Sequence, residues 1–148
     1  MSDLPIVFRP ATPDDQKMIR RMVWRARLDP TSLKWQNFLV AEHEKRIVGI
    51  GQVKSLPGCE ELGSLITHPA YRGRGVARRL LQALEDRTEC PVHLLCAGYM
   101  EPYYDRFGYR TISWWSAPWF LKLKVLPTVV LRVFGMRVLI MRKDCTDG

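Results

Sequence analysis

The stretch Arg72-Gly73-Arg74-Gly75-Val76-Ala77 decides the fold, because its two glycines join a predicted strand to a predicted helix. Glycine lets the backbone turn tightly and approach a ligand closely. The helix predicted to begin at Val76 offers unpaired backbone N–H groups and the positive end of its dipole. Arg72 and Arg74 add side chains that can reach phosphate oxygens. The loop therefore predicts an anion site, most naturally for a phosphate or a pyrophosphate.

The common nucleotide-binding motifs do not fit this loop. A Walker loop needs Gly-Lys-Ser/Thr at the start of the helix, and the sequence has none there. A dinucleotide-binding fingerprint needs a small residue at position 78, where Arg78 stands. The alternative without a function is a surface turn of glycine and arginine.

Predicted strands and helices follow one another in a mixed order along the chain. The strands are predicted at residues 6–8, 38–41, 47–53, 61–67, 92–96, 109–115 and 138–141, and helices after Thr12, from Val76 and over 102–106. This mixed order, with an antiparallel hairpin, predicts an α/β or α+β fold whose sheet carries helices on both faces. A chain of 148 residues without an internal repeat or a linker predicts one domain over residues 1–148.

The composition favours a soluble protein with anionic partners. The net charge is +8, from 23 Lys and Arg against 15 Asp and Glu. No apolar run is long enough to span a bilayer and no signal peptide is visible, so we expect a cytoplasmic protein with reduced thiols. Cys90, His93 and Cys96 lie close in sequence but lack a four-ligand zinc pattern, so no metal site is predicted.

Three motifs, in order along the chain, carry a family resemblance. Arg72, Gly75 and Ala77 match Arg-x-x-Gly-x-Ala, and residues 65–69 (Leu-Ile-Thr-His-Pro) precede them. Residues 103–109 read Tyr-Tyr-Asp-Arg-Phe-Gly-Tyr. Together they resemble the acyl-CoA-binding loop, the end of the fourth strand and the tyrosine motif of the GNAT (Gcn5-related N-acetyltransferase) family. The resemblance implies a mixed, mostly antiparallel sheet of about six to seven strands. It also implies a V-shaped split between strands 4 and 5 and helices on both faces.

The resemblance also implies a cofactor site and a general acid. CoA would lie in the split, with its pantetheine paired to the strand and its pyrophosphate bound by the loop. The implied contacts are Leu65, Ile66, Thr67, Arg72, Gly73, Arg74, Gly75, Val76, Ala77 and Tyr104. Tyr104 matches the tyrosine that sits near the CoA sulfur in many family members and protonates the thiolate. The alternative is an amphipathic core tyrosine.

Acyl transfer from a thioester to an amine also needs a base and a donor to the oxyanion. Strand alternation places Glu61 and Leu65 on one face of their strand and Glu60 and Ile66 on the other. By resemblance, Glu61 takes the amine proton, directly or through water, and the backbone N–H of Ile66 binds the oxyanion. Glu60 is the weaker base candidate, and a solvated strand-end glutamate is the alternative without a catalytic role.

Residues 116–136 are an extended apolar and basic connection before the last strand. Pro127 would break a single helix, so two short segments are predicted. Three interpretations are open: a cover over the acceptor end of the cleft, a homodimer surface, or a basic aromatic patch that touches a membrane or nucleic acid.

The resemblance implies an N-acetyltransferase that moves acetyl from acetyl-CoA to a primary amine by direct attack in a ternary complex. Two other classes of protein stay open. One is a non-catalytic acyl-CoA-binding or regulatory module, since Ala97 stands where many relatives have asparagine. The other is a nucleic-acid-binding domain, which the positive net charge favours, although the sequence contains no nucleic-acid recognition motif. The sequence does not specify the amine acceptor.

Overall fold

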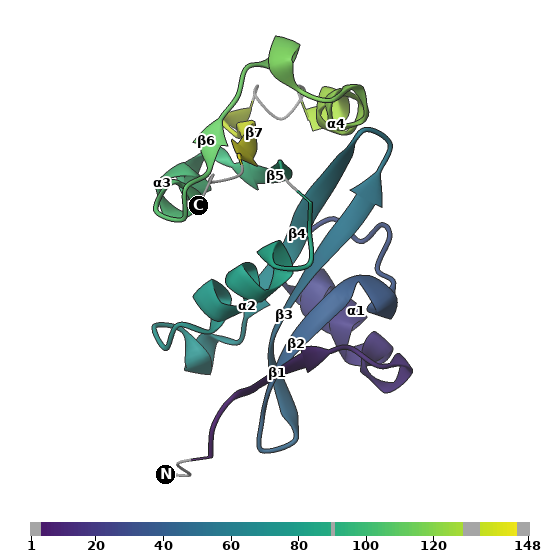
Figure 1. Cartoon of the computed structure of the whole chain (residues 1–148), viewed down its shortest axis with the longest axis vertical. Helices are drawn as coiled ribbons and strands as arrows, with labels where there is room; N and C mark the ends of the chain where they lie inside the picture. The colour runs from purple at the N-terminus through teal and green to yellow at the C-terminus, as the bar shows by residue number, and fades with distance from the viewer. Residues whose placement is uncertain (1–3, 90, 129–133, 145–148) are drawn as a thin grey trace. The chain divides into compact units, whose positions relative to one another are not determined.

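The computed structural model describes residues 4–89, 91–128 and 134–144 (Figure 1). In this part of the chain seven strands form one sheet in the order β1-β2-β3-β4-β5-β7-β6. The chain divides into two compact units. Unit 1 comprises residues 1–53 and 63–87, and unit 2 comprises residues 54–62 and 88–148.

Unit 1 holds the first strands and two helices. Its elements are β1 (Val7–Pro10), α1 (Gln16–Arg25), β2 (Phe38–His43), most of β3 (Arg46–Leu56), the second half of β4 (Cys59–Thr67) and α2 (Val76–Glu85), with short 3-10 turns at Pro13–Asp15, Trp35–Asn37 and Pro69–Tyr71. Strands β1 and β2 are antiparallel, as are β2 and β3. The predicted hairpin is therefore confirmed.

Helix α1 covers one face of the unit 1 strands. Its buried side chains, Ile19 and Val23, pack against Phe38, Val40 and Ile50 of β2 and β3. All five are completely shielded from solvent. Burial of these apolar side chains is the main source of stability that holds α1 against the sheet.

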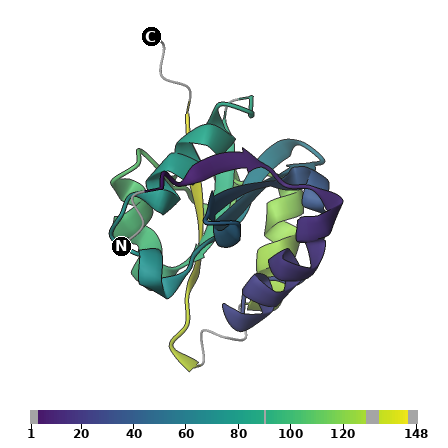
Figure 2. The ribbon, with the colours of Figure 1, turned by 90° about the horizontal axis from the view of Figure 1, so that it is seen from below.

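Helix α2 packs on the other face, directly against the backbone of β3. A Cβ atom at Gly49 would lie 2.8 Å from Val76 Cγ1, and one at Gly51 would lie 2.7 Å from Leu84 Cδ1. Because neighbouring strand residues point to opposite faces, Ile50 between these glycines faces α1. Figures 1 and 2 show the two helices on either side of the strands. Because Gly49 and Gly51 have no side chains, Val76 and Leu84 of α2 can pack closely on β3. This close packing sets the position of α2, and of the loop before it, in unit 1.

A polar cluster ties β1 and β2 to the turn before α1. The backbone N–H of Thr12 donates to Asp15 Oδ2 at 2.8 Å, which closes a capping box. The guanidinium of Arg9 pairs with Asp15 at 2.8 Å and with Glu42 of β2 at 2.6 Å. The hydrogen bond from Arg9 is the main reason that the pKa of Asp15 lies below its ordinary value.

We expect Asp15→Asn to lower the free energy of unfolding at neutral pH by about 1–2 kcal/mol. Because the native pKa of Asp15 is lowered, its charge stabilises the fold above the ordinary value of 3.8, and this contribution is lost as the pH falls below it. Urea unfolding at neutral and at acidic pH measures the difference in the free energy of unfolding between wild type and Asp15→Asn. This difference should be smaller at acidic pH. Asp14→Asn, on the exposed neighbour, is the control. A loss that is the same at both pH values would contradict this role of the Asp15 charge.

Unit 2 holds the last strands and two helices. Its elements are the end of β3 and the first part of β4, then β5 (Val92–Ala97), α3 (Glu101–Asp105), β6 (Arg110–Thr111), α4 (Trp119–Val125) and β7 (Val138–Lys143), with 3-10 turns at Gly98–Met100 and Trp114–Ser116. β5 and β6 both pair with β7 in antiparallel fashion. β4 pairs with β5 in parallel at Glu60–Val92, Glu61–His93 and Leu62–Leu94. The predicted mixed, mostly antiparallel sheet flanked by helices is confirmed.

Helices α3 and α4 lie on opposite sides of β7 (Figure 2). The inner face of α4 is buried through Leu121 and Val125, which pack with Ile140 of β7 and with apolar side chains of the other unit 2 strands. Its outer face leaves Trp119 and Leu123 each 57% exposed. Helix α4 is therefore part of the unit 2 core on one side and carries an apolar surface on the other.

One prediction about residues 109–136 is wrong, and another falls partly outside the described residues. β6 covers Arg110–Thr111 in place of 109–115, because Trp114–Ser116 turn into a 3-10 helix. The hydroxyls of Ser113 and Ser116 lie 3.0 Å apart and stabilise that turn. Within 116–136, α4 ends before Pro127, and residues 129–133 lie outside the described residues. In the described ranges no helix combines the length and apolarity that crossing a bilayer requires.

Candidate active site

The loop of residues 72–77 leads into α2 in unit 1. Gly73 and Gly75 have φ angles of 79° and 78°, and Gly75 caps the ten-residue helix. No described heavy atom lies within 4 Å of a Cβ built on either glycine. The left-handed backbone, and not crowding, therefore requires glycine here. Residues 72–75 are exposed while Val76 is buried, so the loop presents its backbone and the positive end of α2 to solvent.

Tyr71, the residue before the loop, has contacts that the sequence did not predict. Its hydroxyl lies 2.7 Å from Nδ1 of His43, a buried residue of β2. The guanidinium of Arg74 lies 5.0 Å from the centre of the Tyr71 ring. His68 Nδ1 accepts the backbone N–H of Ala70 at 3.1 Å, a contact that stabilises the 3-10 turn at Pro69–Tyr71. These contacts connect one end of the loop to the sheet.

Ser64 of β4 stands between the candidate base and the candidate cofactor contacts and does not have extended backbone. Ser64 has a left-handed φ of 51°, and its hydroxyl accepts a hydrogen bond from Gln52 Nε2 at 3.0 Å. The backbone of β4 is therefore not extended throughout, so whether Glu61 shares a face with Leu65 stays a prediction. Beyond Ser64, Leu65 lies beside Gly51 on the α2 face, and Ile66 packs against the α1 cluster.

Glu61 of β4 is buried in unit 2 and forms an ion pair with α4. It is 5% exposed, so the alternative of a solvated strand-end glutamate is wrong. Lys124 Nζ donates to both of its carboxylate oxygens, at 2.9 Å and 2.7 Å. Glu60 instead accepts the backbone N–H of Glu89 at 2.9 Å. Burial raises the pKa of the neighbouring Cys59 thiol, and the charge of Glu61 raises it further.

Tyr104 lies on α3, also in unit 2, within a cluster of tyrosines. Its ring meets those of Tyr103 and Tyr109 edge-on, with centroids 5.2 Å and 6.1 Å away. Burial raises the pKa of Tyr104 well above its usual value of 10, and nearby Cys96 and Tyr103 add to the effect. The phenol therefore keeps its proton at neutral pH, as a proton or hydrogen-bond donor must.

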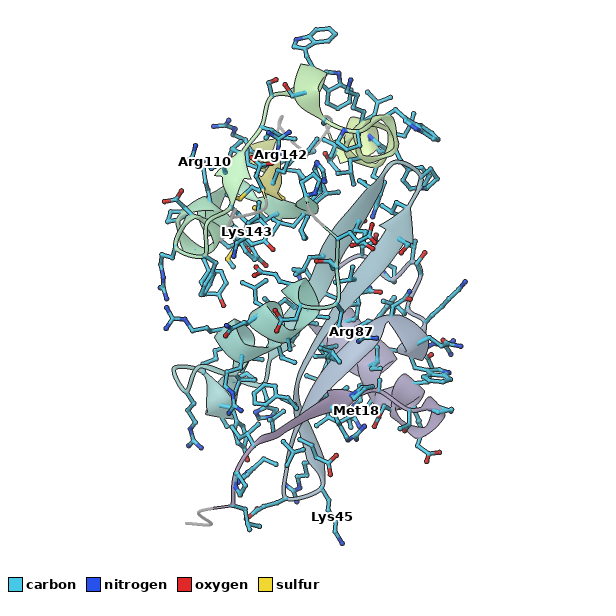
Figure 3. All side chains as sticks on the ribbon, viewed as in Figure 1. Met18, Lys45, Arg87, Arg110, Arg142 and Lys143 are labelled. Carbon is cyan, nitrogen blue, oxygen red and sulfur yellow. The ribbon has the colours of Figure 1, made fainter. Side chains whose placement is uncertain are left out.

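His93 is a buried histidine of β5 and is 4% exposed. Burial lowers its pKa, and Arg142 lowers it further. Arg142 of β7 lies opposite both His93 and Arg110 in the sheet, and Figure 3 shows the two arginines on neighbouring strands. Arg142 also pairs with Asp144 at 3.0 Å. Burial, with a smaller contribution from the charge of Arg142, keeps the imidazole neutral at neutral pH.

The predicted site residues fall into two groups. Residues 65–67 and 72–77 belong to unit 1, and Glu61 and Tyr104 belong to unit 2. Sequence reasoning missed His43, Tyr71 and Lys124, whose contacts join residues far apart in the chain. Within the part of the chain that the structure describes, no three or more His, Cys, Asp or Glu side chains are grouped to hold a metal ion. Cys90 lies outside that part.

A family model described as "Acetyltransferase (GNAT) domain" matches residues 11–114. The chain belongs to the GNAT family of acetyltransferases. The matched range contains the loop, the end of β4 and Tyr104, but stops before α4. The GNAT resemblance of the three sequence motifs is thereby confirmed.

Solved structures of other proteins share the fold at low sequence identity. N-acetylglutamate synthase from Neisseria gonorrhoeae, complexed with coenzyme A and N-acetyl-glutamate, is 17% identical with a TM-score of 0.79, covering 98% of this chain and 36% of that one. Rv2747 from Mycobacterium tuberculosis, in complex with CoA and NLQ, is 20% identical with a TM-score of 0.70, covering 95% and 99%. NAA60 from Arabidopsis thaliana, in complex with a bisubstrate analogue, is 17% identical with a TM-score of 0.60, covering 74% and 86%.

The extent of these matches differs from one protein to another. The present chain spans about a third of the synthase chain, 36% in one complex and 33% in another. No curated protein sequence matches it. At identities this low the structural likeness establishes the GNAT fold.

Proposed function

We propose that this chain is an acetyl-CoA-dependent N-acetyltransferase, a single domain over residues 1–148 that acts on a primary amine. The observation that carries the proposal is the loop of residues 72–77, with two left-handed glycines at the start of α2, in a chain of the GNAT family. The synthase and Rv2747 are both complexed with CoA, which supports acetyl-CoA as the co-substrate.

The residues of unit 1 fit a CoA molecule. The exposed residues 72–75 and the positive end of α2 suit its pyrophosphate, and Arg72 and Arg74 add positive charge. Thr67 Oγ1 is buried and has no hydrogen-bond partner among the described residues. A buried hydroxyl normally has one, and an amide of pantetheine beside residues 65–67 would supply it. Acetyl-CoA provides the thioester that the reaction consumes.

The reaction is a direct transfer in a ternary complex. Glu61, or a water that it holds, takes a proton from the acceptor ammonium. The amine nitrogen then attacks the thioester carbonyl, and the backbone N–H of Ile66 donates to the oxyanion. The C–S bond breaks as the amide forms, Tyr104 gives its proton to the thiolate, and the second proton of the amine nitrogen returns to the Tyr104 oxygen directly or through water. The products are an acetylated amine and CoA.

The alternatives differ in measurable ways. A non-catalytic module would bind acetyl-CoA without turnover, and a nucleic-acid-binding domain would bind DNA or RNA with a steep dependence on salt. A homodimer through residues 116–136 stays a prediction. We expect the acceptor to be a small molecule or peptide with a primary amine.

Calorimetry of acetyl-CoA binding at low and high salt tests the cofactor site. Arg72→Ala should weaken binding about tenfold at low salt, since it removes a charged contact to phosphate. The effect should shrink at high salt because Arg72 is exposed. Arg87→Ala, at the other end of α2, changes the net charge equally and is the control. Equal weakening by both variants would contradict a phosphate contact at the loop.

A further inference from the structure

Among the described residues, the carboxylate of Glu61 is held by the side chain of Lys124 from α4. One ammonium donates to both oxygens, at 2.9 Å and 2.7 Å, and this two-point contact fixes the rotation of the carboxylate plane. A carboxylate has about four lone-pair positions, so positions remain on both oxygens for a further donor. Because Glu61 is only 5% exposed, its negative charge needs the positive charge of Lys124 beside it.

The position of Lys124 is set by the core of unit 2. Leu121 and Val125, on the same helix, are 0% and 8% exposed and pack against β7. The Thr128 hydroxyl donates to the Val125 carbonyl at 2.6 Å at the end of α4. The side chain of Lys124 is itself 22% exposed. The Lys124 ammonium is therefore anchored by a helix that is packed into the core of unit 2. Through this contact, α4 sets the orientation of the Glu61 carboxylate.

We infer that Lys124 is a positioning residue, which orients the Glu61 carboxylate to take the proton of the acceptor amine. The inference rests on the proposed function, in which Glu61 is the base. It gives the segment before the last strand a part in the reaction, although that segment lies outside the range matched by the family model. A purely structural ion pair would stabilise the fold but would not influence the catalytic step separately.

A double-mutant cycle on the full chain tests the inference. The proteins are wild type, Lys124→Met, Glu61→Gln and the double variant, with kcat, both KM values and thermal unfolding measured for each. Methionine keeps the apolar stem of the lysine and removes the charge. We expect Lys124→Met to lower kcat about tenfold, with the KM for acetyl-CoA unchanged. In the Glu61→Gln background it should have no further effect on kcat.

Two more variants separate positioning from stability. Lys124→Arg keeps a charged donor and should recover part of the lost kcat, whereas Lys122→Met on the same helix should behave as wild type. If the methionine variant does not fold, Lys124→Gln replaces it in the cycle, because glutamine keeps a donor without the charge.

The outcomes distinguish the inference from the function on which it rests. Independent effects of Lys124→Met and Glu61→Gln on kcat, in an active enzyme, would overturn the positioning role and leave the acetyltransferase intact. A wild-type protein that acetylates no amine would overturn both. Coupled effects on kcat, with recovery in Lys124→Arg, would support both.

Discussion

Replacing Tyr104 by phenylalanine is expected to lower kcat about a hundredfold or more while the affinity for acetyl-CoA stays unchanged. The substitution removes the hydroxyl that protonates the leaving thiolate and keeps the ring that packs against Tyr103 and Tyr109. Steady-state kinetics give kcat, and calorimetry gives the affinity. Because burial raises the pKa of Tyr104 above 10, its ionisation should cause no loss of rate between neutral pH and that value.

The matched control is Tyr103→Phe. Tyr103 is the neighbouring half-buried tyrosine, and burial also raises its pKa. Its hydroxyl has no part in the proposed reaction, so kcat should stay close to that of wild type. Equal losses in both variants would point to packing of the tyrosine cluster, and an active Tyr104→Phe enzyme would remove Tyr104 from the mechanism.

The second large effect is expected for Glu61→Gln, which should lower kcat about a hundredfold near neutral pH. Glutamine keeps the shape of the side chain and one acceptor for Lys124, but it cannot take the proton of the acceptor ammonium. Activity should recover as the pH rises toward the pKa of the acceptor, about 10 for a lysine-like amine, because the amine then needs no base. Initial rates over this pH range provide the measurement.

Glu60→Gln is the control for this prediction. Glu60 is adjacent in β4 but accepts a backbone N–H from Glu89, so its loss should leave kcat nearly unchanged. Thermal unfolding shows whether each variant is folded at the assay temperature, since Glu61→Gln also weakens a buried ion pair. A Glu61→Gln enzyme as active as wild type across the pH range would exclude Glu61 as the base.

The parts of the fold that depend on residues adjacent in the sequence could be predicted from the sequence. Gly73 and Gly75 mark the turn into α2 because a left-handed backbone requires glycine, and both adopt that conformation. The hairpin of β2 and β3 and the short helix before Gly108 follow from local patterns of the same kind. The GNAT motifs are also local, so the family could be identified before the structure.

Features that depend on distant residues could not be predicted. Nothing near Lys124 in the sequence indicates that it meets Glu61, because their contact joins α4 to β4. The contact of Tyr71 with His43 is equally distant. At Ser64 the left-handed backbone interrupts a strand pattern that otherwise alternates, and serine carries no local signal for this. The predicted strand through Trp114 was wrong because a serine-stabilised turn replaced it.

Acetyl transfer itself is the most direct test of the account. Purified wild-type protein is incubated with acetyl-CoA and a panel of primary amines that includes amino acids, polyamines, and peptides with free N-termini or lysines. Thiol release is followed together with the mass of each amine. We expect at least one amine to gain an acetyl group, with one CoA thiol released for each amide formed and with Tyr104→Phe nearly inactive. A protein that binds acetyl-CoA but acetylates no amine in the panel would contradict the enzymatic function and support a non-catalytic acyl-CoA-binding module.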